Sequence, residues 1–458
     1  MPTQPHLKYL TPEKFLNTIL EEAVRDRASD VHIEPLVDEL RVRFRIDGYL
    51  QERYHRPLME IEPLVTRIKA ISDLDLATRL PQDGHFEFSV ELSESAKNNT
   101  QEATQPVVEM REPPSRLADA FSSLFSTGKQ EDELEQIVSS QPDKKDVTEI
   151  KGTQKTRPAG VYVLNVRVSV FPTVYGEAVV FRLLNRSDML ISLSGLGMEA
   201  SDLAAMRDLI TRTYGMVLTT GPSGSGKTTT LYAILQELKN KEKNIITLED
   251  PVEFYFGDIR QTQIRPEQGL TYAVGMRSVL RQDPDVIMIG EIRDRETAEH
   301  AMRASLVGRM VGSTVHSNTA VGTIARLIDM NVERSLIAFA LNGIIDQRLV
   351  RKVCDVCAAS YAPDPAALRR IGIADGMKGT FRKGSGCAEC GSTGFNGRTG
   401  VFGILVMDDE LQSLIVERSP MRALQEYMEK SDMATLRQRI AEKVLAGVIT
   451  AEEAARAV

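Results

Sequence analysis

The stretch "GMVLTTGPSGSGKTTTLYAILQELKN", residues 215–240, constrains the fold of this chain more strongly than any other. A short apolar run enters a Gly-x-x-x-x-Gly-Lys-Thr loop, and a helical pattern leaves it. A strand before such a loop and a helix after it are the context of a phosphate-binding P-loop. The sequence therefore predicts an α/β domain that binds a nucleotide.

Each residue type in this loop has a predicted task. The glycines let backbone N–H groups turn toward phosphate oxygens, at the positive end of the following helix. Lys227 is expected to reach the β- and γ-phosphates of ATP, and the Thr228 hydroxyl is expected to hold Mg²⁺. The predicted nucleotide-binding set is Gly221, Pro222, Ser223, Gly224, Ser225, Gly226, Lys227, Thr228 and Thr229.

Acidic residues follow two further predicted strands. "NIITLEDPVEF" carries Glu249, Asp250 and Glu253, and "DVIMIGE" ends in Glu291. Parallel strands end at one edge of an open α/β sheet, where ligands bind. No aspartate ends the second strand, so we expect Glu291 to lie beside Mg²⁺ while another acid polarises the attacking water. Each acid alone is also typical of a helix cap or an exposed surface, but the set around a P-loop predicts catalysis.

One histidine and several arginines extend the candidate site. His316 follows the predicted strand in "RMVGSTVHS", although a lone histidine is more often structural than catalytic. Arginines in "MRSVLRQDPD" and "VRVSVFPTVYGEAVVFRLL" are suited to neutralising charge on the γ-phosphate, from the same subunit or from a neighbouring one. Periodicity does not select among them.

The four cysteines form two Cys-x-x-Cys pairs, Cys354 with Cys357 and Cys387 with Cys390. Two such pairs supply four thiolates, which is the ligand set of a structural Zn²⁺ site. Four thiolates leave no open coordination position, so the metal is expected to stabilise a loop rather than to catalyse. A redox role is the alternative, but no thioredoxin-like βαβ pattern surrounds either pair.

The remaining pattern predicts a smaller α+β domain upstream of the nucleotide-binding one. Its helical and alternating stretches are interrupted by a polar segment rich in Ser, Gln, Glu, Lys and Pro. We interpret that segment as a flexible surface insertion or, alternatively, as a segment that folds on a partner. The predicted boundaries are 1–90 with 159–187 for the α+β domain, 91–158 for the insertion, 188–350 for the ATPase core, 351–405 for the tetracysteine element and 406–458 for a helical C-terminal region.

Composition narrows the partners and the compartment. The net charge is −8 and there is no tryptophan, which argues against nucleic acid as the main partner. The N-terminus has no apolar signal-peptide core, and the longest apolar runs have the length of a strand rather than of a membrane span. Cysteines without an export signal favour a reducing compartment, so a cytoplasmic protein is expected.

Taken together, these motifs resemble one family over most of the chain, the secretion ATPases of type II secretion and type IV pilus assembly. Four boxes match in order: "GPSGSGKTTTLY", "TLEDPVE", "RQDPDVIMIGEIRDRETAEHAM" and "STVHSN". The tetracysteine element and the upstream "ASDVHIEP…FRIDG…PQDG" region are similar to that family as well. The paired cysteines favour an assembly or secretion motor over the related retraction motors.

The resemblance implies a homo-hexameric ring in which a PAS-like α+β domain rotates against a RecA-like motor as ATP is cleaved. It implies work on an inner-membrane platform protein and other secretion or pilus components, at the cytoplasmic face of the inner membrane. Glu249 matches the water-activating glutamate, Glu291 the glutamate at Mg²⁺, and His316 the histidine of its box. The matching arginines are Arg167, Arg182, Arg277 and Arg281.

Two departures from the family and two alternatives accompany this interpretation. The chain begins almost at the rotating domain, without the additional N-terminal domain by which many members dock, and the insertion is longer than usual. A RecA-like DNA or conjugative translocase is one alternative, which the acidic charge and few aromatic residues disfavour. The other is a regulatory paralogue that binds ATP without cleaving it, which Lys227, Glu249 and Glu291 disfavour.

Overall fold

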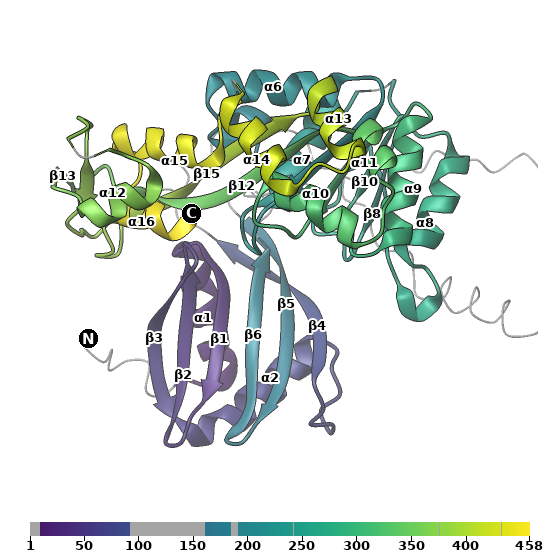
Figure 1. Cartoon of the computed structure of the whole chain (residues 1–458). Coiled ribbons are helices and arrows are strands. Elements are labelled where there is room, and N and C mark those ends of the chain that lie inside the picture. The colour runs from purple at the N-terminus through teal and green to yellow at the C-terminus, as the bar shows by residue number, and fades with distance from the viewer. Residues whose placement is uncertain (1–9, 92–160, 185–190, 241, 375, 432) are drawn as a thin grey trace, which may run out of the picture. The chain divides into compact units, whose positions relative to one another are not determined.

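The computed structural model describes residues 10–91, 161–184, 191–240, 242–374, 376–431 and 433–458 (Figure 1). The chain divides into one large unit, formed by Met1–Val90 and Val163–Val458, and a second unit, Glu91–Tyr162. The predicted insertion at 91–158 lies outside the described residues except for Glu91. No helix within the described ranges combines the length and the apolar character that a bilayer crossing needs.

The N-terminal part of the large unit is a six-stranded sheet with the order β3-β2-β1-β6-β5-β4. Strand β1 pairs antiparallel with β2 and with β6. Strand β2 also pairs antiparallel with β3, and β5 pairs antiparallel with β6. The elements are α1 (Pro12–Arg25), β1 (Ala28–Pro35), β2 (Glu39–Ile46), β3 (Tyr49–Pro57), the 3-10 turn η2 (Leu58–Glu60), α2 (Ile61–Ile71), β4 (Gln82–Glu91), β5 (Val161–Thr173) and β6 (Gly176–Leu184).

Local sequence explains how this sheet acquires a core. The Thr11 side chain accepts a hydrogen bond from the Lys14 amide, and Pro12 occupies the first turn of α1, as the sequence predicts. Helix α1 contacts β1 and α2, and α2 contacts β6. Apolar side chains at alternate strand positions, such as Val31 and Ile33, are fully buried. The period-2 pattern therefore gives a sheet with one face covered by two helices.

The second sheet has seven strands in the order β15-β12-β7-β11-β10-β8-β9. Every neighbouring pair is parallel except β12 with β15. The fold class, a mixed α/β structure with a mainly parallel sheet, is confirmed. The strands are β7 (Gly215–Thr220), β8 (Ile245–Glu249), β9 (Arg260–Gln263), β10 (Val286–Ile289), β11 (Met310–Val315), β12 (Leu341–Val353) and β15 (Phe395–Val406).

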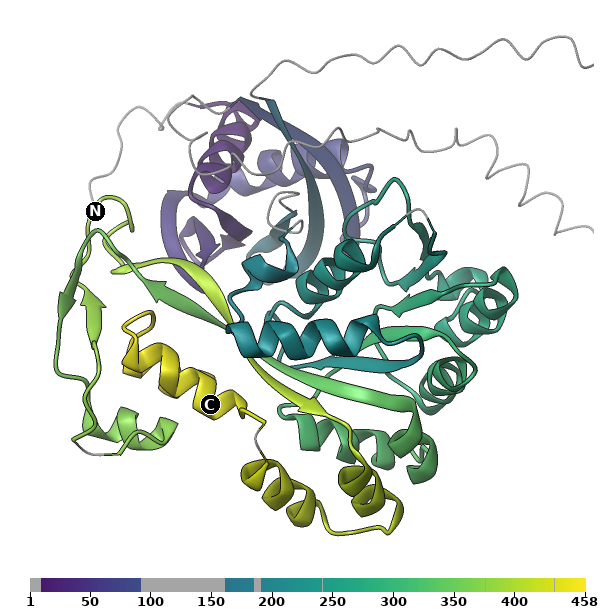
Figure 2. The ribbon, with the colours of Figure 1, turned by 90° about the horizontal axis from the view of Figure 1, so that it is seen from above.

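Helices cover both faces of this sheet (Figure 2). Alternation along β7 shows the two layers, because Met216 and Leu218 belong to one apolar cluster and Val217 to the other. The Val217 cluster contains α6 and α7 side chains, and the other contains side chains of α8 to α11. The bounds are η5 (Leu193–Leu196), α6 (Ala200–Thr211), α7 (Lys227–Leu238), η6 (Pro266–Gln268), α8 (Tyr272–Val279), η7 (Leu280–Gln282), α9 (Arg295–Leu306), α10 (Ala320–Asp329) and α11 (Arg334–Ala340).

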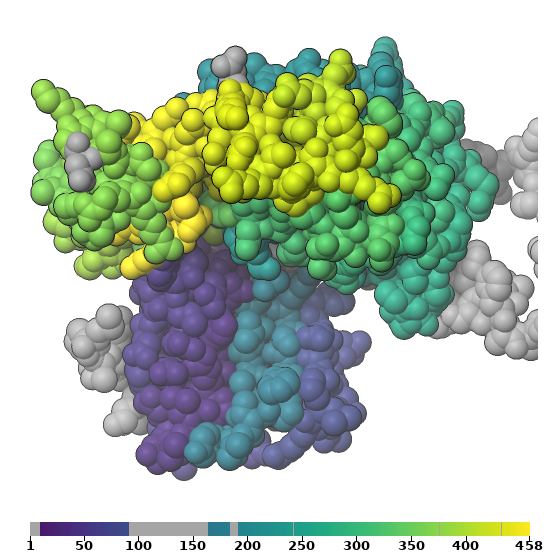
Figure 3. All heavy atoms as spheres, viewed as in Figure 1, coloured from purple at the N-terminus to yellow at the C-terminus, as the bar shows by residue number. Residues whose placement is uncertain are grey.

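The C-terminal part adds two groups of helices. Helices α13 and α14 lie against α11 and α10, and their atoms form a continuous surface with them (Figure 3). Helices α12, α15 and α16 share a separate apolar cluster with Val350 of β12 and Val401 of β15. The bounds are β13 (Ala358–Ser360), α12 (Pro365–Ile371), β14 (Arg382–Gly384), α13 (Asp409–Val416), α14 (Met421–Lys430), α15 (Leu436–Leu445) and α16 (Ala451–Ala457).

Candidate nucleotide and zinc sites

The sheet order brings the candidate residues to one edge. Strands β7, β11, β10 and β8 are parallel neighbours, so their carboxyl ends lie in a row. The P-loop follows β7, His316 follows β11, Glu291 follows β10, and Glu249 ends β8. Open α/β sheets bind ligands at this edge.

The backbone of the P-loop requires its glycines. Gly221, Gly224 and Gly226 have φ of 146°, 77° and 88°, in the region that disfavours other residues. A Cβ on Gly221 would lie 2.4 Å from the Gln347 carbonyl oxygen. Gly226 is the N-cap of α7, so the helix N-terminus opens directly onto the loop, where it favours an anion.

The polar side chains of the loop suit the binding of a nucleoside triphosphate. The Lys227 ammonium donates to the carbonyl oxygens of Gly221 and Pro222, at 2.8 and 3.0 Å. Burial lowers the pKa of Lys227, and the charge of Glu291 acts in the opposite direction. The Thr228 side chain is exposed, whereas the Ser225 hydroxyl is buried without a hydrogen-bond partner in the structure. A lysine near the loop carbonyls and open hydroxyl groups suit phosphate and Mg²⁺.

Glu291 lies at the centre of a charged cluster. One carboxylate oxygen is 3.3 Å from Nε2 of His316, and the other is paired with the guanidinium of Arg293. Arg293 also lies 3.6 Å from the Asp250 carboxylate. His316 remains 55% exposed, so it faces solvent beside Glu291. The structure thus brings three of the predicted residues together, linked by an arginine that the sequence did not single out.

Glu249 occupies a different environment from Glu291. Its carboxylate is only 3% exposed and accepts hydrogen bonds from Tyr232 and Thr247, each at 2.5 Å, and from Gln261 at 3.0 Å. Thr247 and Glu249 are two residues apart on β8 and therefore share the face that α7 covers. The acid lies at the expected strand end, within a polar network of buried side chains.

The predicted arginines fall into two groups. Arg167 of β5 binds both carboxylate oxygens of Glu253, at 3.2 and 3.0 Å. Burial raises the pKa of Glu253, and the charge of Arg167 opposes that shift. Arg182 of β6 pairs with Asp30 at 3.2 Å.

Two arginines near α8 are exposed. The Arg277 guanidinium lies 2.6 Å from Glu296, and Arg281 donates to the carbonyl oxygen of Arg277 at 3.0 Å. Both contacts are made on the molecular surface rather than with the P-loop. Exposure does not separate them from Arg182, whose side chain is 64% exposed.

Gln347 is a site residue that sequence reasoning missed. Its amide donates to the Ser225 carbonyl oxygen at 2.7 Å and accepts from the Thr230 hydroxyl at 2.8 Å. Gln347 lies on β12, which pairs with the P-loop strand β7. The contact joins residues 122 positions apart in the chain, so no local pattern could reveal it.

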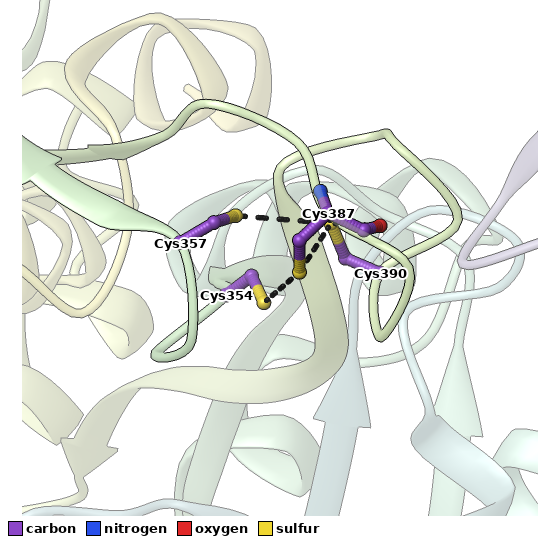
Figure 4. Close-up of side chains that lie close together, drawn as sticks. All are labelled: Cys354, Cys357, Cys387 and Cys390. Carbon is purple, nitrogen blue, oxygen red and sulfur yellow. Dashed lines mark hydrogen bonds between the residues drawn. The ribbon is translucent and has the colours of Figure 1, made fainter.

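The four cysteine side chains point toward one another (Figure 4). All four sulfur atoms lie within 4.8 Å of one another, with Cys354–Cys387 and Cys357–Cys390 separations of 3.8 Å. Four thiolates at about 2.3 Å from a zinc ion lie about 3.8 Å apart in a tetrahedron. Burial opposes ionisation of Cys390, but amide N–H groups of Cys387 and Gly394 lower the pKa of its thiol to about 6. The donor set therefore fits Zn²⁺.

The sheet and its edge together define a class of protein, the RecA-like P-loop ATPases. A family model described as Type II/IV secretion system protein matches residues 10–141 and 143–456. The type II secretion system protein E of Pseudomonas aeruginosa is 37% identical over 97% of this chain and 74% of its own length. The type IV pilus assembly ATPase PilB of Myxococcus xanthus is 36% identical over 96% of this chain and 66% of its own length.

Solved structures agree on the fold. The Legionella pneumophila ATPase DotB matches with a TM-score of 0.61 at 19% identity, covering 99% of this chain and 97% of DotB. The pilus retraction motor PilT matches with a TM-score of 0.54 at 22% identity, covering 97% of this chain and 96% of PilT. The chain belongs to the Type II/IV secretion system protein family, and its enzyme class is ATPase.

Proposed function

We propose that this protein is a hexameric ATPase motor that powers type IV pilus assembly or type II protein secretion. The observation that carries the proposal is the row of strand ends in which the P-loop, His316, Glu291 and Glu249 succeed one another. The relatives named for type II secretion and for pilus assembly support both kinds of fibre equally, at 37% and 36% identity.

In the proposed reaction, this edge holds ATP and orients a water molecule. Lys227 and the P-loop amides bind the phosphates, and Thr228 with Glu291 would hold Mg²⁺, which offsets phosphate charge when it is bound. Glu249 would accept a proton from a water molecule whose oxygen bonds to the γ-phosphorus, while the bond from that phosphorus to the bridging oxygen breaks and ADP leaves. His316, 3.3 Å from Glu291, would hydrogen-bond to that acid. Arg167, Arg182, Arg277 and Arg281 are proposed to offset phosphate charge, within a subunit or between neighbours.

The mechanical part of the proposal concerns domains and partners. Rotation of the α+β domain, 1–90 with 159–187, against the core, 188–350, would transmit the energy of hydrolysis to an inner-membrane platform protein. We propose that three further parts are attached to this motor: the insertion at 91–158, the tetracysteine element at 351–405 and the helices at 406–458. We propose that the protein is cytoplasmic and that its partner proteins hold it at the inner membrane. Nucleic acid is not proposed as a partner.

The proposal also includes a structural zinc ion in the tetracysteine element. Cys354, Cys357, Cys387 and Cys390 are proposed to hold one structural Zn²⁺ per chain. The support is the sulfur spacing together with backbone amides that donate to Cys390 from Cys387 and Gly394, each at 3.2 Å. Such amide bonds stabilise a thiolate, the form that binds metal.

A turnover assay tests the motor proposal. Lys227→Ala should abolish ATP hydrolysis, whereas Lys239→Ala, at the end of the same helix, should leave it unchanged. The cytoplasmic domain of the platform protein should stimulate the wild type, and double-stranded DNA should not. Stimulation by DNA alone would favour a translocase, and a wild-type ring without turnover would favour a regulatory paralogue.

A further inference from the structure

Three side chains donate hydrogen bonds to the carboxylate of Glu249. One oxygen accepts from the Tyr232 hydroxyl, and the other accepts from Thr247 and Gln261. The donors come from α7, β8 and β9, so three elements converge on one acid. Because the carboxylate is 3% exposed, it has little access to solvent in this arrangement.

The Tyr232 hydroxyl is kept in the protonated form that donates a hydrogen bond to Glu249. The side chain is fully buried, and burial raises the pKa of Tyr232, as does the neighbouring Glu249, so the hydroxyl keeps its proton. The same oxygen accepts from the amides of Glu253 and Phe254, at 3.2 and 3.4 Å. The ring packs edge-on against Phe256, with centroids 5.3 Å apart. The phenol therefore links the P-loop helix to the segment that follows β8.

The strand that carries Glu249 is not a direct neighbour of the P-loop strand. Two strands, β11 and β10, separate β8 from the P-loop strand β7, which is about 14 Å at the usual strand spacing. Glu291, not Glu249, is the acid whose charge acts on Lys227. A general base must reach hydrogen-bonding distance of the water that it activates. Because the Glu249 side chain is buried, the hydrogen-bond network around it has to open before a water molecule can reach the carboxylate.

We propose that Tyr232 is a positioning residue for ATP hydrolysis, which holds the Glu249 carboxylate withdrawn until the acid is needed at the attacking water. The inference rests on the proposed role of Glu249 as the water-activating acid. Tyr232 lies five residues after Lys227 on the helix that begins at the P-loop, so a shift of that helix on nucleotide binding moves the donor directly.

Tyr232→Phe in the full-length protein tests this inference, because it removes the hydroxyl and keeps the ring. Loss of one hydrogen bond that must break before catalysis should raise kcat about 5-fold, with KM for ATP unchanged. Thr247→Val removes a second donor from the same carboxylate and should raise kcat in the same direction. Tyr427→Phe, whose hydroxyl contacts Asp408 on the C-terminal helices, is the matched control and should have wild-type kcat.

Glu249→Gln, alone and combined with Tyr232→Phe, separates this inference from the proposed function. Both variants should be inactive while still binding a fluorescent ATP analogue. A Tyr232→Phe enzyme whose kcat is no higher than that of the wild type, beside an inactive Glu249→Gln, would overturn the inference alone. Wild-type turnover by Glu249→Gln would instead contradict the role of Glu249 itself, and the inference with it.

Discussion

The P-loop edge and the tetracysteine element are two candidate binding sites that differ in exposure. Strand β12 connects them, because it pairs with the P-loop strand β7 and ends one residue before Cys354. At the edge, Thr228 is exposed and His316 is 55% exposed, although Lys227 is buried. In the tetracysteine element the groups face inward, and Cys354 is fully buried. A substrate that must enter and leave needs an open site, whereas a permanent ion needs a closed one. The two candidate sites therefore differ in how many of their groups reach solvent.

Replacing Cys354 with Ser should have the largest effect and tests whether the closed site is structural. Zinc in a structural site contributes roughly 10 kcal/mol to the folding of the segment that it holds. We expect the variant to lose zinc, and the segment of β13 and β14 to become sensitive to protease. Metal analysis and limited proteolysis measure both effects.

The open site should survive that substitution, which sharpens the comparison. Binding of a fluorescent ATP analogue to Cys354→Ser should stay within about 2-fold of the wild type, a change of less than 0.5 kcal/mol. Loss of nucleotide binding together with zinc would show that β12 couples the two sites. If the wild-type protein contained no zinc and its tetracysteine element still resisted protease, the prediction of a structural zinc site would be wrong.

Gly226→Ala should be the next most damaging change, because it affects the open site through its backbone. The φ of 88° is unfavourable for alanine by about 1–2 kcal/mol, and the new Cβ would lie 2.9 Å from Nε2 of Gln347. Gly224→Ala carries similar strain at φ 77°, with no atom within 4 Å of the new Cβ. Titration with an ATP analogue should therefore show weaker binding for Gly226→Ala than for Gly224→Ala, and equal binding would contradict this account.

Gln347→Leu should weaken ATP binding about 10-fold. It leaves the Thr230 hydroxyl and the Ser225 carbonyl without their partner, at about 1–3 kcal/mol for a buried unsatisfied group. Zinc content should not change, since Gln347 lies at the P-loop end of β12. Gln268→Leu on an exposed turn is the control, and equal affinities for the two variants would remove Gln347 from the site.

Asp346→Asn should have the smallest effect, and it depends on pH. Burial raises the pKa of Asp346 to about 6, although Arg348 at 2.9 Å favours the charged form. The folded state therefore prefers the protonated carboxyl, and this contribution to stability is lost as the pH rises from about 4 through about 6.

Urea unfolding at pH 4.5 and pH 7 measures that contribution. The gap in unfolding free energy between wild type and Asp346→Asn should move in favour of the variant at the higher pH. Asp38→Asn, on an exposed turn, serves as the control. A gap that stays constant with pH would show that Asp346 does not titrate differently in the folded protein.

Sequence reasoning could select candidate residues where they lie close together in the chain, and their catalytic and metal-binding roles stay predictions. The P-loop glycines, the acids after β8 and β10, and the cysteine pairs each lie within a few residues, so spacing identifies them. Parallel pairing then brings Glu291 and His316 within 3.3 Å of each other. The mainly parallel α/β fold followed from strands that alternate with helices.

Contacts between distant segments were beyond that reasoning. Gln347 meets Ser225 across 122 residues, and Tyr232 meets Glu249 across 17. Which donor reaches which acceptor depends on the register of β12 against β7 and on the rotation of α7. An isolated glutamine or tyrosine carries no sign of such a contact, because both are common in apolar helices and strands. The domain boundaries and the roles of the arginines remain predictions.

Strand β12 also has a mechanical consequence. It runs from Gln347, beside the P-loop, through a register irregularity between Arg351 and Val353, and ends next to Cys354. The six steps from Gln347 to Val353 measure about 20 Å in an extended chain. A tilt of about 5° at the nucleotide end would therefore sweep the thiolate end through about 2 Å. A small change of angle at the P-loop would therefore displace the tetracysteine element farther than the P-loop itself.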